Sequence, residues 1–75
     1  MSNIEKYKRV FSSVFGSSNV ETLKFGDDGW NSAGHFELLT AIEKEFLVHL
    51  ETDEMMSFVS FAEGIKILEK HDIKF

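Results

Sequence analysis

The sequence predicts an all-α protein: a four-helix bundle with a long first loop and a short third helix. Apolar residues recur at helical spacing in three stretches, and proline is absent from the chain. No stretch alternates apolar and polar residues for long enough to build a sheet. The 75 residues are enough for a single domain, residues 1–75, with one small core.

The first helix is expected from about Asn3 to Phe15. Its apolar stripe falls on one face and comprises Ile4, Tyr7, Phe11, Val14 and Phe15. The run Gly16-Ser17-Ser18-Asn19 ends this helix, because these residues favour turns and left-handed backbone conformations.

A long loop follows, to about Trp30. Four apolar residues are expected to anchor it across the bundle: Val20, Leu23, Phe25 and Trp30. The sequence Gly26-Asp27-Asp28-Gly29 predicts a turn. Its two aspartates lack the remaining ligand spacing of a calcium loop, so no metal site is expected there.

The second helix is expected from about Ser32 to Leu47, with Asn31 as its N-cap. Its core candidates are Leu38, Leu39, Ile42 and Phe46. This assignment places Ser32 at the exposed head of the helix, where backbone N–H groups and the helix dipole favour an attached anion such as phosphate. The Ser32 hydroxyl is therefore a candidate site for a phosphodiester.

Two further helices complete the bundle. Thr52 or Asp53 is expected to cap a short third helix that ends near Ser57. The last helix is expected to start at Ser60, because Ser60-Phe61-Ala62-Glu63 has the pattern of a capping box. Its inner face comprises Phe61, Ile65 and Leu68, and the helix fades near Lys70 and His71.

Charge and composition exclude several functions. Between Asp27 and Glu63 there are nine acids and one base, Lys44, so nucleic acid is not an expected partner. This acidic stretch indicates either docking to basic protein surfaces or a merely solvated face. Cysteine is absent, which excludes disulfides and means that thioester chemistry needs a thiol from outside the polypeptide.

The location expected from the sequence is cytoplasmic. No apolar run approaches the roughly 20 residues of a membrane span, so no membrane insertion is expected. The N-terminus also lacks the apolar segment of a signal peptide. The three histidines do not have the spacing of a metal site.

The stretch Trp30-Asn31-Ser32-Ala33-Gly34-His35-Phe36-Glu37-Leu38-Leu39 resembles the motif of the acyl carrier protein family. That motif has an acidic residue, a serine and a large aliphatic, followed by an amphipathic helix rich in glutamate. The nearest resemblance is to stand-alone carriers with a tryptophan before the motif and a Gly-His pair after it, a group that includes D-alanyl carrier proteins. The resemblance spans nearly the whole chain.

The chain departs from the family at two positions. Asn31 stands where the family usually has an aspartate that helps hold the metal ion of the loading transferase. Ala33 stands where the family has leucine or methionine, which helps dock partners.

The resemblance implies that a phosphopantetheinyl transferase attaches 4′-phosphopantetheine to Ser32. The arm's thiol would carry an acyl or aminoacyl group as a thioester, loaded by an acyl- or aminoacyl-activating ligase and delivered to acyl-transfer enzymes, as in fatty acid biosynthesis. The partner-binding residues implied are Asn31, Ala33, Phe36, Glu37, Thr40 and Lys44. The implied acyl cleft contains Leu39, Met55, Met56 and Val59, and a monomer is expected. The cargo stays open.

Two other interpretations remain beside the carrier. An unmodified acyl-carrier-like interaction module is favoured by Asn31 and Ala33. A small serine hydrolase would pair Ser32 with His35, but the sequence offers no third triad group and no oxyanion hole. We therefore expect no catalytic activity, and a structural role for His35 in bonding the loop or the helix start. Phe36 is either an interface anchor or packed within the domain.

Overall fold

The computed structural model describes residues 1–27 and 29–75. Asp28, one of the two acids expected in the turn, lies outside the described residues. The described part contains four helices and no strand: α1 (Asn3–Phe15), α2 (Ser32–Phe46), α3 (Thr52–Ser57) and α4 (Phe61–Glu69). The all-α class predicted from the sequence is therefore confirmed.

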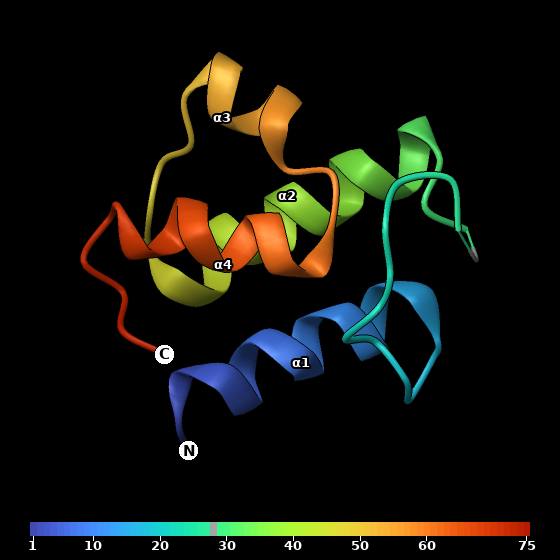
Figure 1. Cartoon of the computed structure of the whole chain (residues 1–75), viewed down its shortest axis with the longest axis horizontal. Coiled ribbons are helices and arrows are strands. Elements are labelled where there is room, and N and C mark those ends of the chain that lie inside the picture. Colours follow the sequence, from blue (N-terminus) through green and yellow to red (C-terminus); the bar gives the residue numbers. More distant parts are fainter. Residues whose placement is uncertain (28) are drawn as a thin grey trace.

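The helices are arranged around α2 and α4, with α1 on one side of this pair and α3 on the other (Figure 1). α1 packs against α2. The two chain termini lie near each other, and the side-chain amide of Asn3 donates a 2.9 Å hydrogen bond to the carbonyl oxygen of Lys74.

The hydrophobic core draws on α1, α2, α4 and the connecting segments. Its buried members are Tyr7, Val10, Phe11, Val20, Leu23, Trp30, Leu38, Leu39, Ile42, Leu50, Phe58, Phe61, Ile67 and Leu68. The Tyr7 hydroxyl donates a 2.7 Å hydrogen bond to the Phe61 carbonyl oxygen. Burial raises the pKa of Tyr7, so the phenol stays neutral. α3 contributes no buried residue.

The expected helix bounds are confirmed within a residue, but parts of the expected apolar faces are wrong. On α1, Tyr7 and Phe11 are buried as expected, whereas Val10 was not expected in the core. Five expected core residues are only half-buried: Ile4, Val14, Phe15, Phe46 and Ile65. Ile4, Val14, Phe15 and Phe46 lie within the first or last two residues of α1 or α2, where fewer neighbouring segments cover a side chain.

Two of the expected caps also need correction. Glu51, and neither Thr52 nor Asp53, is the N-cap of α3. Its backbone N–H donates a 2.9 Å hydrogen bond to the Glu54 carboxylate. The Ser60 hydroxyl accepts from the Glu63 N–H at 3.0 Å, but the return bond of a capping box is not among those formed by the described residues.

The long loop is tied down as expected by three of its four apolar residues, because Val20, Leu23 and Trp30 are buried. The expectation for Phe25 is wrong, since 47% of its surface is exposed. The chain folds back between Phe25 and Trp30, and the Gly26 N–H donates to the Trp30 carbonyl oxygen at 2.8 Å. This turn leaves Phe25 outside, with its ring edge-on to that of His35.

Candidate functional site

Ser32 is the first residue of α2 and is exposed. Asn31 caps the helix as expected, because its side-chain oxygen accepts from the Gly34 N–H at 2.9 Å. Its carbonyl oxygen accepts from the His35 N–H at 2.7 Å. Within residues 1–27 and 29–75, no group accepts a hydrogen bond from the N–H of Ser32 or Ala33. Both N–H groups are therefore open to an anion bound at this helix start.

The first turn of α2 also suits an anion. α2 has no acidic residue in its first turn, whereas α1, α3 and α4 each carry at least one. No carboxylate of that turn therefore offsets the positive end of the α2 dipole.

An apolar groove with a volume of about 550 Å³ adjoins Ser32. Its lining residues are Phe25, Ser32, His35, Phe36, Leu39, Met55, Met56 and Val59. The volume lies within the range of small-molecule sites in proteins. The structure thus brings the four expected cleft residues, Leu39, Met55, Met56 and Val59, to one groove beside the candidate attachment serine.

Two aromatic residues of this lining, Phe25 and Phe36, were not among the expected cleft residues. Phe25 lies in the long loop, where no helical or strand periodicity indicates which side chains face the groove. Phe36 lies four residues after Ser32, so helical spacing alone could have placed both on one side of α2.

His35 joins three parts of the site. The indole Nε1 of Trp30 lies 2.9 Å from His35 Nδ1. Because an indole N–H only donates, Nδ1 must be the acceptor and the ring proton must lie on Nε2. His35 Nε2 then donates to the carbonyl oxygen of Met55, 2.9 Å away on α3. The expected structural role of His35, bonding the loop, is confirmed.

These bonds bear on the hydrolase interpretation. A general base must accept a proton from its nucleophile through a free ring nitrogen. In His35 one nitrogen accepts from Trp30 and the other donates to Met55. The His35 ring is therefore not arranged as a base for Ser32.

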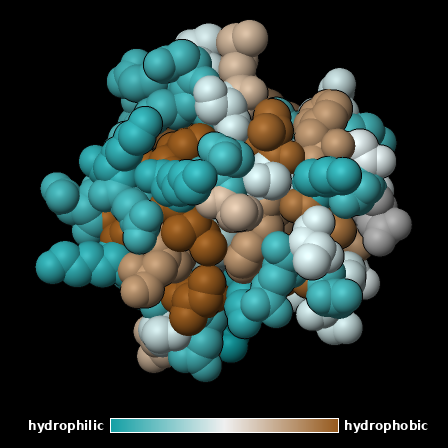
Figure 2. Space-filling model, in the orientation of Figure 1, coloured by the Kyte–Doolittle hydropathy of each residue, from teal (hydrophilic) through white to brown (hydrophobic). Residues whose placement is uncertain are grey.

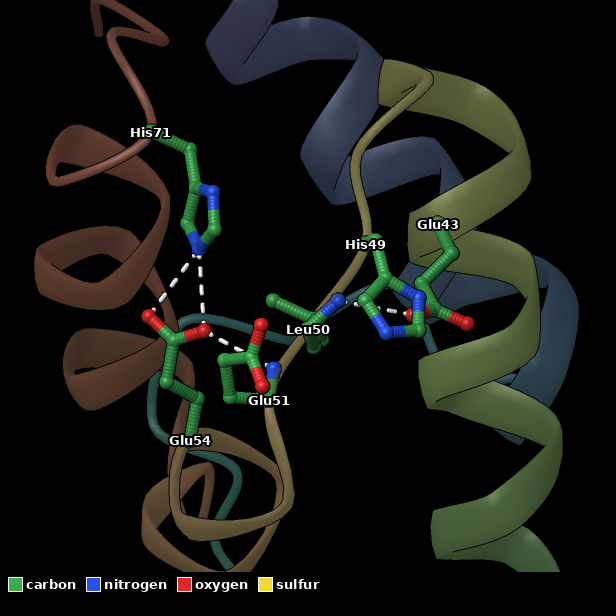
Figure 3. A network of polar contacts seen from close by, with 6 residues as sticks. All are labelled: Glu43, His49, Leu50, Glu51, Glu54 and His71. Carbon is green, nitrogen blue, oxygen red and sulfur yellow. Dashed lines mark hydrogen bonds and ion pairs between the residues drawn. The ribbon is translucent and has the colours of Figure 1, made fainter.

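α3 is attached at its other side by a second histidine (Figure 3). His71 Nε2 donates to both carboxylate oxygens of Glu54, at 3.0 and 2.9 Å. The pKa of Glu54 lies below its usual range, mainly because the carboxylate accepts the Glu51 N–H, with His71 adding to the effect. Polar contacts of this kind hold α3 in place, together with the half-buried Met55.

The segment between α2 and α3 is fixed by Glu43. Its Oε2 accepts the backbone N–H of Leu50 at 2.8 Å and lies 3.7 Å from His49 Nδ1. Figure 3 shows this contact beside the pair formed by Glu54 and His71. His49 lies at the surface and His71 at the edge of the core.

All six expected partner-binding residues are exposed on α2 or at its cap: Asn31, Ala33, Phe36, Glu37, Thr40 and Lys44. Phe36 is 73% exposed, so the alternative that it packs within the domain is wrong. Met56 is 74% exposed and lines the same groove. On the face drawn in Figure 2, apolar surface emerges between hydrophilic side chains.

The described residues show neither a metal-binding cluster nor a membrane-spanning helix, and comparison with known proteins finds no relative. Among the described residues, no three histidine, aspartate or glutamate side chains gather closely enough to hold a metal ion. None of the helices in the described ranges has the length and apolarity needed to span a bilayer. No protein-family model matches the chain, and no curated protein or solved structure shows significant similarity to it.

Proposed function

We propose that this chain is an acyl carrier protein and that Ser32 bears 4′-phosphopantetheine. One observation carries the proposal: the exposed Ser32 stands at the first residue of α2 and also lines an apolar groove. A phosphodiester on Ser32 would lie beside the N–H groups of Ser32 and Ala33, for which residues 1–27 and 29–75 provide no acceptor, at the positive end of the helix dipole. The family resemblance of residues 30–39 supports the same assignment.

The residues around Ser32 fit this prosthetic group. The N–H groups at the start of α2 would hold the phosphate, and no acid of the first turn would repel it. Exposure of Ser32 gives a transferase access to the hydroxyl. Once attached, the arm supplies the thiol that this cysteine-free chain lacks, and with it the thioester link to the cargo.

The groove favours an apolar acyl cargo over a charged aminoacyl group. Its lining consists of apolar side chains, Ser32 and His35. The His35 ring is neutral in the observed hydrogen-bonding pattern, and both its nitrogens are occupied. An ammonium group would therefore lose its hydration in this groove without gaining a carboxylate, whereas an alkyl chain gains from leaving water.

The arrangement of the helices is compatible with an acyl-carrier-like bundle of one domain, with its long first loop and short third helix. In this proposal the exposed α2 face carrying Phe36 and Glu37 meets the partner enzymes. These are a phosphopantetheinyl transferase, an acyl-activating ligase and acyl-transfer enzymes. Basic surfaces on these enzymes would complement the acidic middle of the chain and speed encounter.

The loading reaction tests the proposal. Intact-mass measurement after incubation with coenzyme A and a broad-specificity transferase should show one added arm on the wild type and none on Ser32→Ala. Asn31→Asp should load faster, because it restores the acidic residue of the family motif. Equal addition to Ser32→Ala, or no addition to either the wild type or Asn31→Asp, would contradict the proposal.

A second candidate function is an interaction module that is never modified. Asn31 and Ala33 depart from the family motif, and the exposed Phe36 and Met56 offer anchors for a protein partner. The Asn31→Asp variant separates the two candidates. An interaction module stays unloaded even when the acidic residue is restored, whereas a carrier does not.

A further inference from the structure

His35 connects the two sides of the groove to the loop that precedes Ser32. Its ring comes from α2, accepts from Trp30 in the loop, and donates to the Met55 carbonyl oxygen of α3. We propose that His35 is a positioning residue that couples occupancy of the groove to the loop holding Ser32. This inference rests on the proposed function in taking the groove to be the site of an apolar acyl chain.

The α3 side of the groove is the one that yields. α3 has six residues and buries none of them, and a helix this short has little stability of its own. The α2 side is anchored by the buried Leu38, Leu39 and Ile42. An alkyl chain that enters the groove contacts Met55 and therefore shifts α3, with the Met55 carbonyl oxygen, more readily than it shifts α2.

The loop side of the connection is rigid. Trp30 is 1% exposed and its ring lies between two others. It stacks on Phe15, with ring centroids 5.3 Å apart, and on His35, with centroids 6.1 Å apart. Because Trp30 is hydrogen-bonded and stacked to the same imidazole, a tilt of the His35 ring must change the surroundings of the indole N–H.

Trp30 also provides the measurement. It is the one tryptophan of the chain, so the protein gives a single indole N–H signal in a ¹⁵N-edited NMR spectrum. Trp30 does not line the apolar groove. A response of this signal to a ligand in the groove therefore reports transmission through neighbouring residues. His35 lines the groove and also contacts the Trp30 ring, and its substitution tests whether it transmits the response.

The test is a titration of the full chain with decanoate, an unattached alkyl carboxylate. In the wild type, the signals of Leu39, Met55 and the Trp30 indole should all shift. In His35→Leu, the Leu39 and Met55 signals should still shift, and most of the Trp30 response should be lost. His35→Gln should retain that response, because an amide both accepts and donates.

A matched control loosens α3 without touching Trp30. His71→Leu removes the contact with Glu54 at the other side of α3 and should leave the Trp30 response in place. Its loss in His71→Leu would mean that general loosening of α3, and not the His35 connection, governs the signal.

Several results would overturn the coupling. These are an equal Trp30 response in His35→Leu, no Trp30 response in the wild type, or no decanoate effect on Leu39 and Met55. Should His35→Leu fail to fold, the ring nitrogens of wild-type His35 decide: decanoate must shift their ¹⁵N signals together with that of the Trp30 indole, and unchanged ring signals would overturn the coupling. Decanoate needs no attachment to Ser32, so failure of Ser32 loading and failure of the coupling are separate results.

Discussion

The α-carbon of Gly34 faces the carbonyl oxygen of Gly29 so closely that a Cβ on Gly34 would overlap this oxygen. The same Cβ would lie 3.3 Å from Cε1 of Phe15. The first turn of α2 therefore meets the backbone of the preceding loop directly. Glycine permits this approach, and the approach fixes the position from which Ser32 starts the helix.

Gly34→Ala should therefore destabilise the protein and slow the loading of Ser32. The added methyl group pushes the loop away from α2, at a cost of about 1–3 kcal/mol for an overpacked site. Thermal unfolding and the initial rate of arm transfer measure the two effects. Ala33→Gly is the control: it is exposed and should cost at most about 1 kcal/mol of helix propensity. A Gly34→Ala protein with wild-type stability and loading rate would contradict this argument.

Gly64 is the second glycine that a side chain would disturb. A Cβ there would overlap the Tyr7 hydroxyl and the Phe58 ring, both in the core. Gly64→Ala should lower the free energy of unfolding by about 3 kcal/mol, although alanine is the better helix former. Denaturant unfolding measures the change.

The control for Gly64 lies on the same helix. Ala62→Gly, at an exposed position of α4, should cost only about 1 kcal/mol of helix propensity. If Gly64→Ala were neutral or stabilising, the close packing of Tyr7 on α4 would be wrong.

Leu47 carries unfavourable backbone geometry. It ends α2 in the left-handed conformation, with φ 55°, and its side chain is 90% exposed. Leu47→Gly should stabilise the protein by about 1 kcal/mol, because glycine adopts this conformation without the Cβ clash. Leu47→Ala keeps the Cβ and should give no such gain. Equal stabilisation by both substitutions, measured as a rise in Tm, would attribute the effect to the lost apolar surface instead.

Acid should weaken the protein through two capping glutamates. The pKa of Glu5 is lowered chiefly by the Ser2 N–H and that of Glu54 chiefly by the Glu51 N–H. Since each folded-state pKa lies below the ordinary value of 4.5, the unfolded chain takes up these protons at higher pH. The two caps contribute their full stability above pH 4.5. This contribution is lost as the pH falls from that value through the folded-state pKa values of Glu5 and Glu54.

Thermal unfolding across this acidic range measures the effect. The wild-type Tm should fall as pH drops below about 4.5. A variant with both Glu5→Gln and Glu54→Gln keeps the side-chain shape without the charge, so its Tm should fall less over the same interval. An identical decline in the variant would exclude the two caps as the cause.

The sequence predicted the helices well because their signals are local. Asn31 and Gly16 mark a helix start and a helix end through their own backbone and side-chain chemistry. The exposed position of Ser32 at the start of α2 follows from the same local rules. Periodicity also identified Leu38 and Ile42 as core residues.

The contacts around the groove could not be predicted, because they join segments distant in sequence. Nothing near His35 indicates that its ring donates to Met55, 20 residues away. The position of Phe25 depends on the turn that brings Gly26 to Trp30. Glu51 became the cap of α3 because its N–H and the Glu54 carboxylate meet, a role that cap preferences assign to Thr52 or Asp53 instead.

The central claim is that Ser32 carries a phosphopantetheine arm in the living cell. It is tested most directly by mass spectrometry of the protein isolated from its own cells, with the peptide that contains Ser32 analysed under conditions that preserve thioesters. The account predicts that this peptide carries the arm on Ser32, with an apolar acyl group on part of the population. A Ser32 peptide that is uniformly unmodified would contradict the account and favour the interaction module.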